Sequence, residues 1–441
     1  MKTAWERILV LLLAALLLAG CAQSGKPAAE AAAASGTAAP SPVPTEEPTQ
    51  EPTEEPTPEP TEEPTPEPTP EPTEEPTPEP GPFEADYALL WEILETDYPY
   101  LPYLREKGIN VDGVRETYAK LVKDTKNVKA FAEIIGKVFA SLRNTAHLHM
   151  IPEYLFKDMY GIYVLSPESK DDPFRAPWRD VMMQAAEIGY YTAPKEYSSG
   201  LSSMTGVYFN VKVQYYEDCK TLCFSVPTFD FYSVERDKDV FINAIKQYPE
   251  AENIIFDITR NSGGDDRYWI NNIVAPFGTD YTFEWREFFR SSPENERIVT
   301  GWMELYNTSE AEDAPEWATA YGLDRFFCMS AEVKGFEAIH SDAKRWVLVN
   351  STVYSSSEEF VCFCKATGWA TIAGTHTGGD GLGFDPVIRL LPDSGLLFRF
   401  SMDAGENPDG TMNIEGTTPE VILETADVKH LLDLIREEQG H

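Results

Sequence analysis

Basic residues are scarce in this chain of 441 residues. Lys and Arg number 36 against 73 Asp and Glu, which gives a net charge of −37. Phosphate groups repel such a surface, so unaided binding to nucleic acid or to anionic lipid headgroups is excluded as a main function. Long apolar runs are also rare. The run from Ile8 to Leu18 is too short to span a bilayer as a mature helix, and no other segment is long and apolar enough.

The first residues have the pattern of an export signal. A basic start is followed by the apolar run and then by Leu18-Ala19-Gly20-Cys21. This end resembles the bacterial lipoprotein lipobox, which implies cleavage before Cys21 and lipid attachment to its thiol. We therefore expect residues 1–20 to be a signal peptide and the mature protein to be lipid-anchored on the extracytoplasmic face of the bacterial cell membrane. An ordinary secretory peptide is the alternative.

Residues 21–81 contain no pattern of a packed core. From Pro44 to Pro80 the sequence repeats Glu, Pro and Thr, with thirteen Glu and no base. Such a composition favours extended polyproline II and cannot bury apolar surface. At ~3.1 Å per residue this segment could reach on the order of 100 Å. We predict that the lipidated cysteine is followed by a disordered stalk.

Globular composition begins after residue 81. Residues 82–150 are predicted to form a helical region, with one helix ending before Pro99 and another starting at Val128 with Asn127 as its cap. Residues 151–219 follow as an unassigned insertion.

Residues 220–441 alternate short apolar runs with amphipathic segments. This pattern predicts an α/β fold with a buried, largely parallel sheet. A closing helix is expected with its cap at Thr425. The predicted strands are 222–226, 254–258, 346–349 and 370–373, a helix covers 355–367, and a hairpin joins 387–391 to 396–402.

Two of the predicted strands end in residues suited to chemistry. A Gly263-Gly264 turn follows the strand at 254–258 and would let backbone N–H groups approach a substrate. A serine run from Ser355 to Ser357 opens the helix at 355–367, where unpaired N–H groups suit an oxyanion. Ser-x-x-Glu is also a helix capping box, and spacing alone does not separate the two interpretations.

Three stretches in order resemble the tail-specific (C-terminal-processing) protease family. They are Phe256-Asp257-Ile258-Thr259-Arg260-Asn261-Ser262-Gly263-Gly264, then Tyr354-Ser355-Ser356-Ser357-Glu358 with Ile372-Ala373-Gly374-Thr375, and Ile414-Glu415-Gly416-Thr417-Thr418-Pro419-Glu420. The likeness covers about residues 220–425. It implies a crotonase-like core, and the helical region before it is similar to members without a PDZ domain.

The resemblance implies that Ser355 is the nucleophile. Where the Ser–Lys branch has its general base in Gly-Lys-Gly, this chain places Asp380. The tricorn-like branch instead takes a His from the N-terminal region and a Glu from the closing segment. On that pattern we predict His147 as base, with His149 as the alternative, and Glu415 as the orienting carboxylate.

The oxyanion hole is expected from the N–H groups of Gly263 or Gly264 and of Ser356. His376 is another candidate base, although a loop role explains it better. No metal or other cofactor is expected, since six His and no carboxylate motif do not complete a metal site.

The predicted function is that of a membrane-anchored, extracytoplasmic serine-type endopeptidase. It would cleave peptide or protein substrates through an acyl-enzyme, with the bilayer as a further partner through the lipid. The alternative is a degenerate family member that binds peptides or apolar ligands without cleaving them. The sequence leaves the oligomeric state open.

Overall fold

The computed structural model describes residues 81–440, except 168, 170–171, 173–174, 197–210, 301–307 and 311–313. Residues 80–441 form one unit by their contacts. The predictions for the signal peptide, for Cys21 and for the stalk lie outside the described residues. Across the ranges described, the structure has no helix with the length and hydropathy needed to cross a membrane.

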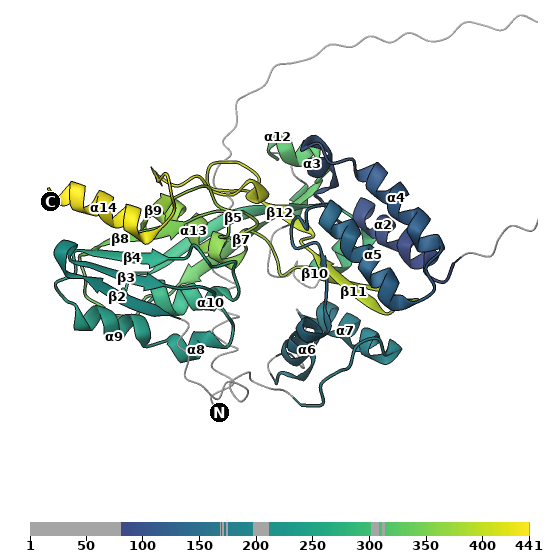
Figure 1. Cartoon of the computed structure of the whole chain (residues 1–441), viewed down its shortest axis with the longest axis horizontal. Helices are drawn as coiled ribbons and strands as arrows, with labels where there is room; N and C mark the ends of the chain where they lie inside the picture. Colours follow the sequence, from purple (N-terminus) through teal and green to yellow (C-terminus); the bar gives the residue numbers. More distant parts are fainter. Residues whose placement is uncertain are drawn as a thin grey trace, which may run out of the picture. The chain divides into compact units, whose positions relative to one another are not determined.

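The fold is built around a largely parallel six-stranded sheet, here called the main sheet (Figure 1). Its strand order is β13-β9-β8-β4-β3-β2, and β2 alone runs antiparallel to its neighbour. The predicted buried parallel sheet is therefore confirmed. The strands are β2 (Lys212–Tyr216), β3 (Thr221–Ser225), β4 (Asn253–Asp257), β8 (Lys344–Val349), β9 (Thr371–Gly374) and β13 (Val421–Ile422).

Helices cover both faces of the main sheet because its strands are apolar on both sides. In β4, Phe256 packs toward one face and Ile255 toward the other. Figure 1 shows α9 and α14 on opposite sides of β8, β4 and β3. The helices of this half are α8 (Ser233–Asp237), α9 (Val240–Gln247), α10 (Asp266–Tyr268), the π-helix η5 (Trp269–Val274), α13 (Ser356–Thr367) and α14 (Val428–Gln439).

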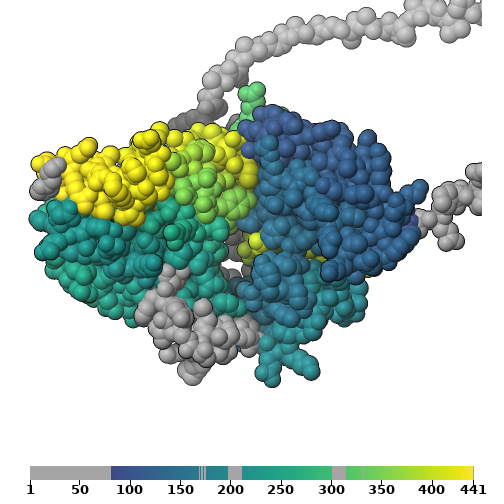
Figure 2. All heavy atoms as spheres, in the orientation of Figure 1, coloured from purple at the N-terminus to yellow at the C-terminus, as the bar shows by residue number. Residues whose placement is uncertain are grey.

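The helical region packs on a small antiparallel sheet of order β1-β11-β10. The rings of Phe139 and Phe398 lie 5.6 Å apart across this contact. Arg389 forms a buried ion pair with Asp97 at 3.2 Å. In Figure 2 the blue surface of this region adjoins the yellow-green segments of the second half. Its elements are α2 (Glu84–Thr96), α3 (Leu101–Glu106), α4 (Val111–Lys123), α5 (Val128–Ser141), β1 (His149–Met150), α6 (Glu153–Tyr160), the π-helix η2 (Gly161–Leu165), α7 (Ala176–Ile188), β10 (Val387–Leu391) and β11 (Leu396–Phe400).

A second antiparallel sheet, of order β12-β5-β7-β6, lies in the stretch that the sequence patterns left without elements. Its strand β5 pairs along its whole length with β7. The elements are β5 (Tyr281–Phe289), α11 (Pro293–Thr300), β6 (Thr308–Glu310), α12 (Glu316–Ala320), β7 (Arg325–Val333) and β12 (Asp403–Gly405).

Most predicted caps and boundaries agree with the structure to within a few residues. The side chain of Asn127 accepts a hydrogen bond from Ala130 N and caps α5, as predicted. The closing helix is the exception. Its cap is Asp427, which accepts from His430 N at 2.9 Å, rather than Thr425. Both residues are suitable caps, and the apolar face of the helix fixes its start two residues later.

Candidate active site

Ser355 lies between the carboxyl end of β8 and the first turn of α13. Its backbone has φ 59° and ψ −137°, a conformation that residues other than glycine rarely adopt. Ser355 N donates to Gly379 O at 3.2 Å, which holds the turn against the loop after β9. The strand–turn–helix geometry places Ser355 at the carboxyl end of the sheet, on a strained turn of the type that exposes a nucleophile.

The Gly263-Gly264 turn packs directly on this serine. A Cβ on Gly263 would lie 2.8 Å from Ser355 Cβ and 3.0 Å from Ser356 N, and its φ is 105°. A Cβ on Gly264 would lie 2.2 Å from Phe229 O. Only glycine fits at either position, and the absence of a side chain at Gly263 lets the turn pack against Ser355.

The N–H groups of this turn have different partners. Gly263 N donates to Asn261 Oδ1 at 2.9 Å, so Gly263 does not supply the oxyanion donor. Ser356 N is at the first position of α13, where helical N–H groups have no acceptor within the helix. Within the residues described, Ser356 N and Gly264 N have no backbone or side-chain acceptor, so these two groups remain as donors.

His147 lies in the loop between α5 and β1, and the fold brings it to the turn that carries the serine. Its backbone N donates to the hydroxyl of Tyr354 at 3.2 Å, and the two rings are 5.0 Å apart. Tyr354 is the residue before Ser355. Among the described residues, no direct hydrogen bond joins His147 to Ser355.

The carboxylate that pairs with His147 is Asp380. Nδ1 of His147 lies 2.7 Å from Asp380 Oδ2 and 3.1 Å from Ser401 Oγ. Asp380 also accepts from the hydroxyl of Tyr354 and from Asn413 Nδ2. An ionised carboxylate only accepts, so the proton of neutral His147 is on Nδ1 and the lone pair is on Nε2. This is the tautomer that a general base requires.

Asp380 is almost completely buried, yet it is held ionised. Burial alone raises the pKa of this carboxyl, but the pairing with His147 and the hydrogen bonds from Tyr354 and Ser401 outweigh it, so that the pKa lies below the ordinary value. His147 and Asp380 both have φ 57°, close to the 59° of Ser355. All three residues therefore have a positive φ, which is unfavourable for residues with a Cβ and persists only because contacts with the surrounding structure hold the backbone in place.

His149 begins strand β1 and has both ring nitrogens occupied. Nδ1 lies 2.8 Å from Met150 O, and Nε2 accepts from Arg399 Nε at 2.8 Å. Burial and the charge of Arg399 lower the pKa of His149 to about 4. Of these two histidines, His147 alone keeps a ring nitrogen, Nε2, with no partner in the part of the chain that the structure describes.

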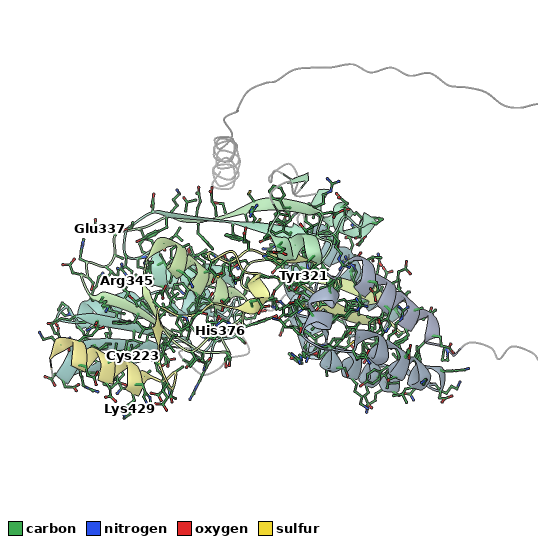
Figure 3. All side chains as sticks on the ribbon, turned by 90° about the horizontal axis from the view of Figure 1, so that it is seen from above. Cys223, Tyr321, Glu337, Arg345, His376 and Lys429 are labelled. Atoms are coloured by element: carbon green, nitrogen blue, oxygen red, sulfur yellow. The ribbon has the colours of Figure 1, made fainter. Side chains whose placement is uncertain are left out.

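Glu415 does not take the position that the sequence predicted for it. Its carboxylate pairs with Lys107 at 2.9 Å and is partly exposed, while Asp380 occupies the place beside His147. His376, labelled in Figure 3, bonds to this closing segment through Thr418 Oγ1 at 3.1 Å and Glu415 O at 2.6 Å. Both ring nitrogens of His376 are used in these contacts, which fits a loop role.

Asp380, Tyr354 and Ser401 are the site residues that sequence reasoning missed. The sequence places Asp380 where the Ser–Lys branch has its base, but the orienting role was predicted for Glu415. The signal was present in the sequence, because a chain that lacks the Lys and supplies a His needs a carboxylate to orient it. Among the described residues, no group of three or more His, Cys, Asp or Glu side chains is placed to hold a metal.

Comparisons with known proteins give the class of protein. Residues 221–423 match the sequence model of Peptidase family S41, and residues 82–140 match that of the Tricorn protease C1 domain. No curated protein matches the sequence significantly. The chain is thus a serine-type peptidase, a hydrolase, and its residues 221–423 are similar to Peptidase family S41.

Solved structures share the fold. A candidate peptidase from Parabacteroides merdae is 18% identical with a TM-score of 0.50, over 82% of this chain and 96% of that one. Mature CPAF in complex with lactacystin is 12% identical with a TM-score of 0.50, over 81% and 97%. The photosystem II D1 C-terminal processing protease is 16% identical with a TM-score of 0.41, over 80% and 96%. At these identities, the two structures with a TM-score of 0.50 show the mixed α/β fold alone.

Proposed function

We propose that the chain is a lipid-anchored, extracytoplasmic endopeptidase whose catalytic residues are Ser355, His147 and Asp380. The observation that carries this proposal is the 2.7 Å contact between His147 Nδ1 and Asp380 Oδ2, in a loop bonded to the residue before Ser355. It replaces the predicted Glu415 with Asp380 and keeps the predicted nucleophile and base.

In the proposed reaction Ser355 Oγ attacks the scissile carbonyl while Nε2 of His147 takes the hydroxyl proton. Asp380 stabilises the imidazolium that forms and keeps it oriented. The imidazolium then protonates the leaving amine, and the acyl group stays on Ser355 Oγ. A water molecule, deprotonated by His147, hydrolyses this ester and restores the serine.

The negative charge of each tetrahedral intermediate would lie at the N-terminus of α13. Ser356 N and Gly264 N are the donors proposed for it, and the helix dipole adds to their effect. Gly263 serves this site by its missing side chain, since a Cβ there would meet Ser355.

The pairing of His147 with Asp380 supports a place in the Ser-His, tricorn-like branch, as does the match to the Tricorn protease C1 domain. The parallel order of β9, β8, β4 and β3 supports a crotonase-like core. The lipobox at Cys21 supports anchoring to the bacterial cell membrane, and the peptide substrate would then be extracytoplasmic.

The test is covalent labelling of the full chain, purified in detergent, with a fluorophosphonate probe. Wild type should label at Ser355, as located by peptide mass. Ser355→Ala should abolish labelling, and His147→Ala should reduce its rate on the order of 10⁴-fold or more. His340→Ala, which changes an exposed histidine, is the matched control and should label as wild type.

Labelling that survives Ser355→Ala would overturn the nucleophile. No labelling of the folded wild type would favour the alternative of a family member that binds peptides without cleaving them. The anchor is tested separately: Cys21→Ser should move the protein from the membrane fraction to the soluble fraction, and an unchanged distribution would contradict lipid attachment.

A further inference from the structure

Two buried carboxyl groups contact each other close to the loop that carries Asp380. Glu287 lies on β5 and Asp403 on β12, which pair antiparallel with Gly405 opposite Glu287 (Figure 1). Asp403 is two residues from Gly405, so the two carboxyl groups are diagonal neighbours on one face of the second sheet. The exposed fraction is 0% for Glu287 and 1% for Asp403. Water therefore does not solvate either carboxyl group.

Each carboxyl group has one oxygen with a neutral donor and one oxygen without. Trp285 Nε1 donates to Glu287 Oε1 at 2.7 Å, and Phe384 N donates to Asp403 Oδ2 at 3.2 Å. Glu287 Oε2 and Asp403 Oδ1 are buried and have no other partner among the residues described. These two oxygens can form a hydrogen bond with each other only if one of them is protonated, because an ionised carboxylate only accepts.

Among the described residues, no Lys, Arg or His forms an ion pair with Glu287 or Asp403. Arg286, the residue before Glu287 on β5, pairs with Glu406 at 2.7 Å. The titratable groups that act on the pair from other elements are Tyr100, Glu359 and Asp380. Burial and the charge of Asp403 raise the pKa of Glu287 well above its ordinary value, and burial raises the pKa of Asp403. The pair therefore retains a proton at pH values where an exposed Asp or Glu has lost it.

Asp403 is connected to Asp380 by two routes. Its Oδ2 accepts from the backbone N of Phe384, which follows Asp380 by four residues in the same loop. Its backbone O accepts from the hydroxyl of Tyr100 at 2.9 Å, and this hydroxyl lies 3.2 Å from Asn413 Oδ1. Asn413 Nδ2 donates in turn to Asp380 Oδ1 at 3.3 Å. The place of the Asp380 carboxylate therefore depends on the place of Asp403.

The chain just before β12 also reaches the histidine. Ser401 precedes Asp403 by two residues, and its Oγ lies 3.1 Å from His147 Nδ1. The same hydroxyl is 3.3 Å from Asp380 Oδ2. A shift of β12 relative to β5 would therefore move both groups that contact Nδ1 of His147.

We propose that Glu287 and Asp403 are positioning residues whose shared proton holds β12 and the Asp380 loop in the arrangement that catalysis requires. The inference rests on the proposed peptidase function and adds a control by pH to the same site. Loss of the proton as pH rises would leave two negative charges in contact within the core, and their repulsion would separate β12 from β5. Activity should therefore be complete at pH values below the ionisation of the pair and should be lost above it.

Glu287→Gln is the main test, because it copies the protonated pair without a proton to lose. Its amide oxygen can accept from Trp285 Nε1, and its amide N–H can donate to Asp403 Oδ1 at every pH. The rate of fluorophosphonate labelling at Ser355 is measured for the full chain in detergent from about pH 5 to about pH 10. Wild-type labelling should reach a plateau and then fall by about 10-fold per pH unit above the ionisation of the pair, whereas Glu287→Gln should keep the plateau rate.

Two further variants make the comparison specific. Glu287→Leu removes the donor to Asp403 and should slow labelling at all pH values, on the order of 10-fold or more, so recovery in Glu287→Gln reports on the hydrogen bond. Glu284→Gln changes an exposed carboxyl group on the same strand and should keep the wild-type profile. Glu358, whose pKa is raised by burial to about 7, is unchanged in all these variants and contributes equally to each profile.

Infrared absorption of carboxylic acid C=O groups detects the shared proton independently of activity. At neutral pH Glu287→Gln should lose part of this absorption relative to wild type, and Glu284→Gln should not. Equal spectra of Glu287→Gln and wild type, or labelling profiles that coincide across the pH range, would overturn the positioning role and leave the peptidase proposal intact. Absence of labelling in folded wild type would overturn the peptidase proposal itself, and with it the site that the pair is proposed to position.

Discussion

The serine and histidine of the candidate site come from two regions that are built differently. Ser355 and the Gly263-Gly264 turn follow neighbouring parallel strands, β8 and β4, of one sheet. His147 lies on a loop whose contacts reach 207 residues along the chain to Tyr354 and 254 residues to Ser401. The strand ends place the nucleophile by local topology, whereas the base depends on contacts between distant segments. Changes at the two regions should therefore have different consequences.

The largest effect on activity is expected from a change in the contact between His147 and Asp380, which are far apart in the chain. Asp380→Asn keeps the shape of the side chain but presents an N–H to His147 Nδ1, which favours the wrong tautomer. We expect kcat to fall on the order of 10³–10⁴-fold, as in other triads. The rate of fluorophosphonate labelling measures this loss, with circular dichroism to show an unchanged fold. Activity within a few-fold of wild type would remove Asp380 from the site.

Gly263→Ala tests the region in which the ends of neighbouring strands position Ser355. The new Cβ would lie 2.8 Å from Ser355 Cβ on a backbone with φ 105°, so we expect a loss of stability of about 1–3 kcal/mol and a large loss of labelling. Urea unfolding measures the first and probe kinetics the second. Gly322→Ala, which has a similar positive φ but nothing within 4 Å of its Cβ, is the control and should lose stability alone. Equal labelling by both variants would contradict the close packing at Ser355.

Glu358, in the first turn of α13, should make the stability of the fold depend on pH. Burial raises the pKa of this carboxyl from 4.5 to about 7, and Thr377 Oγ1 donates to it at 2.8 Å. The folded chain keeps a proton that the unfolded chain releases above pH 4.5. The stabilisation is therefore complete below that pH and is lost as pH rises to about 7, by about 3 kcal/mol in all.

Glu358→Gln should abolish the loss of stability with rising pH that is due to this carboxyl group. The difference in unfolding free energy between variant and wild type should grow in favour of the variant from pH 5 to pH 7 and stay constant above, as measured by urea unfolding. Glu437→Gln, at an exposed position of α14, should give a curve parallel to wild type. A constant difference between Glu358→Gln and wild type across this range would contradict the prediction.

The smallest effect is expected at Glu415. Its carboxylate is partly exposed and pairs with Lys107, and such pairs contribute about 0–1 kcal/mol. Glu415→Gln should change peptide cleavage and labelling by less than about 3-fold. A loss comparable to that of Asp380→Asn would return the orienting role to Glu415 and contradict the assignment made from the contacts.

The same contrast explains which features the sequence could predict. Strands β3, β4, β8 and β9 are short apolar runs and α5 has a clear cap at Asn127, so local patterns sufficed for these elements. The choice of Ser355 came from the family resemblance, because spacing alone did not separate a nucleophile from a capping box. The second sheet was missed because β5 and β7 pair across an intervening stretch of more than 30 residues, with polar and aromatic residues mixed along them. Asp380 was found as a departure from a motif, but its partner depends on a fold contact that no periodicity encodes.

The pairing of β1 with β11 also bears on when the enzyme can act. His149 pairs with Arg399, and the loop of His147 is bonded to Ser401. A ribosome must therefore synthesise a further 254 residues after His147 before the contact with Ser401 can form. A chain that ends before Ser401 carries the histidine without the contact that holds its loop, so the topology delays assembly of the candidate site until this late segment has folded.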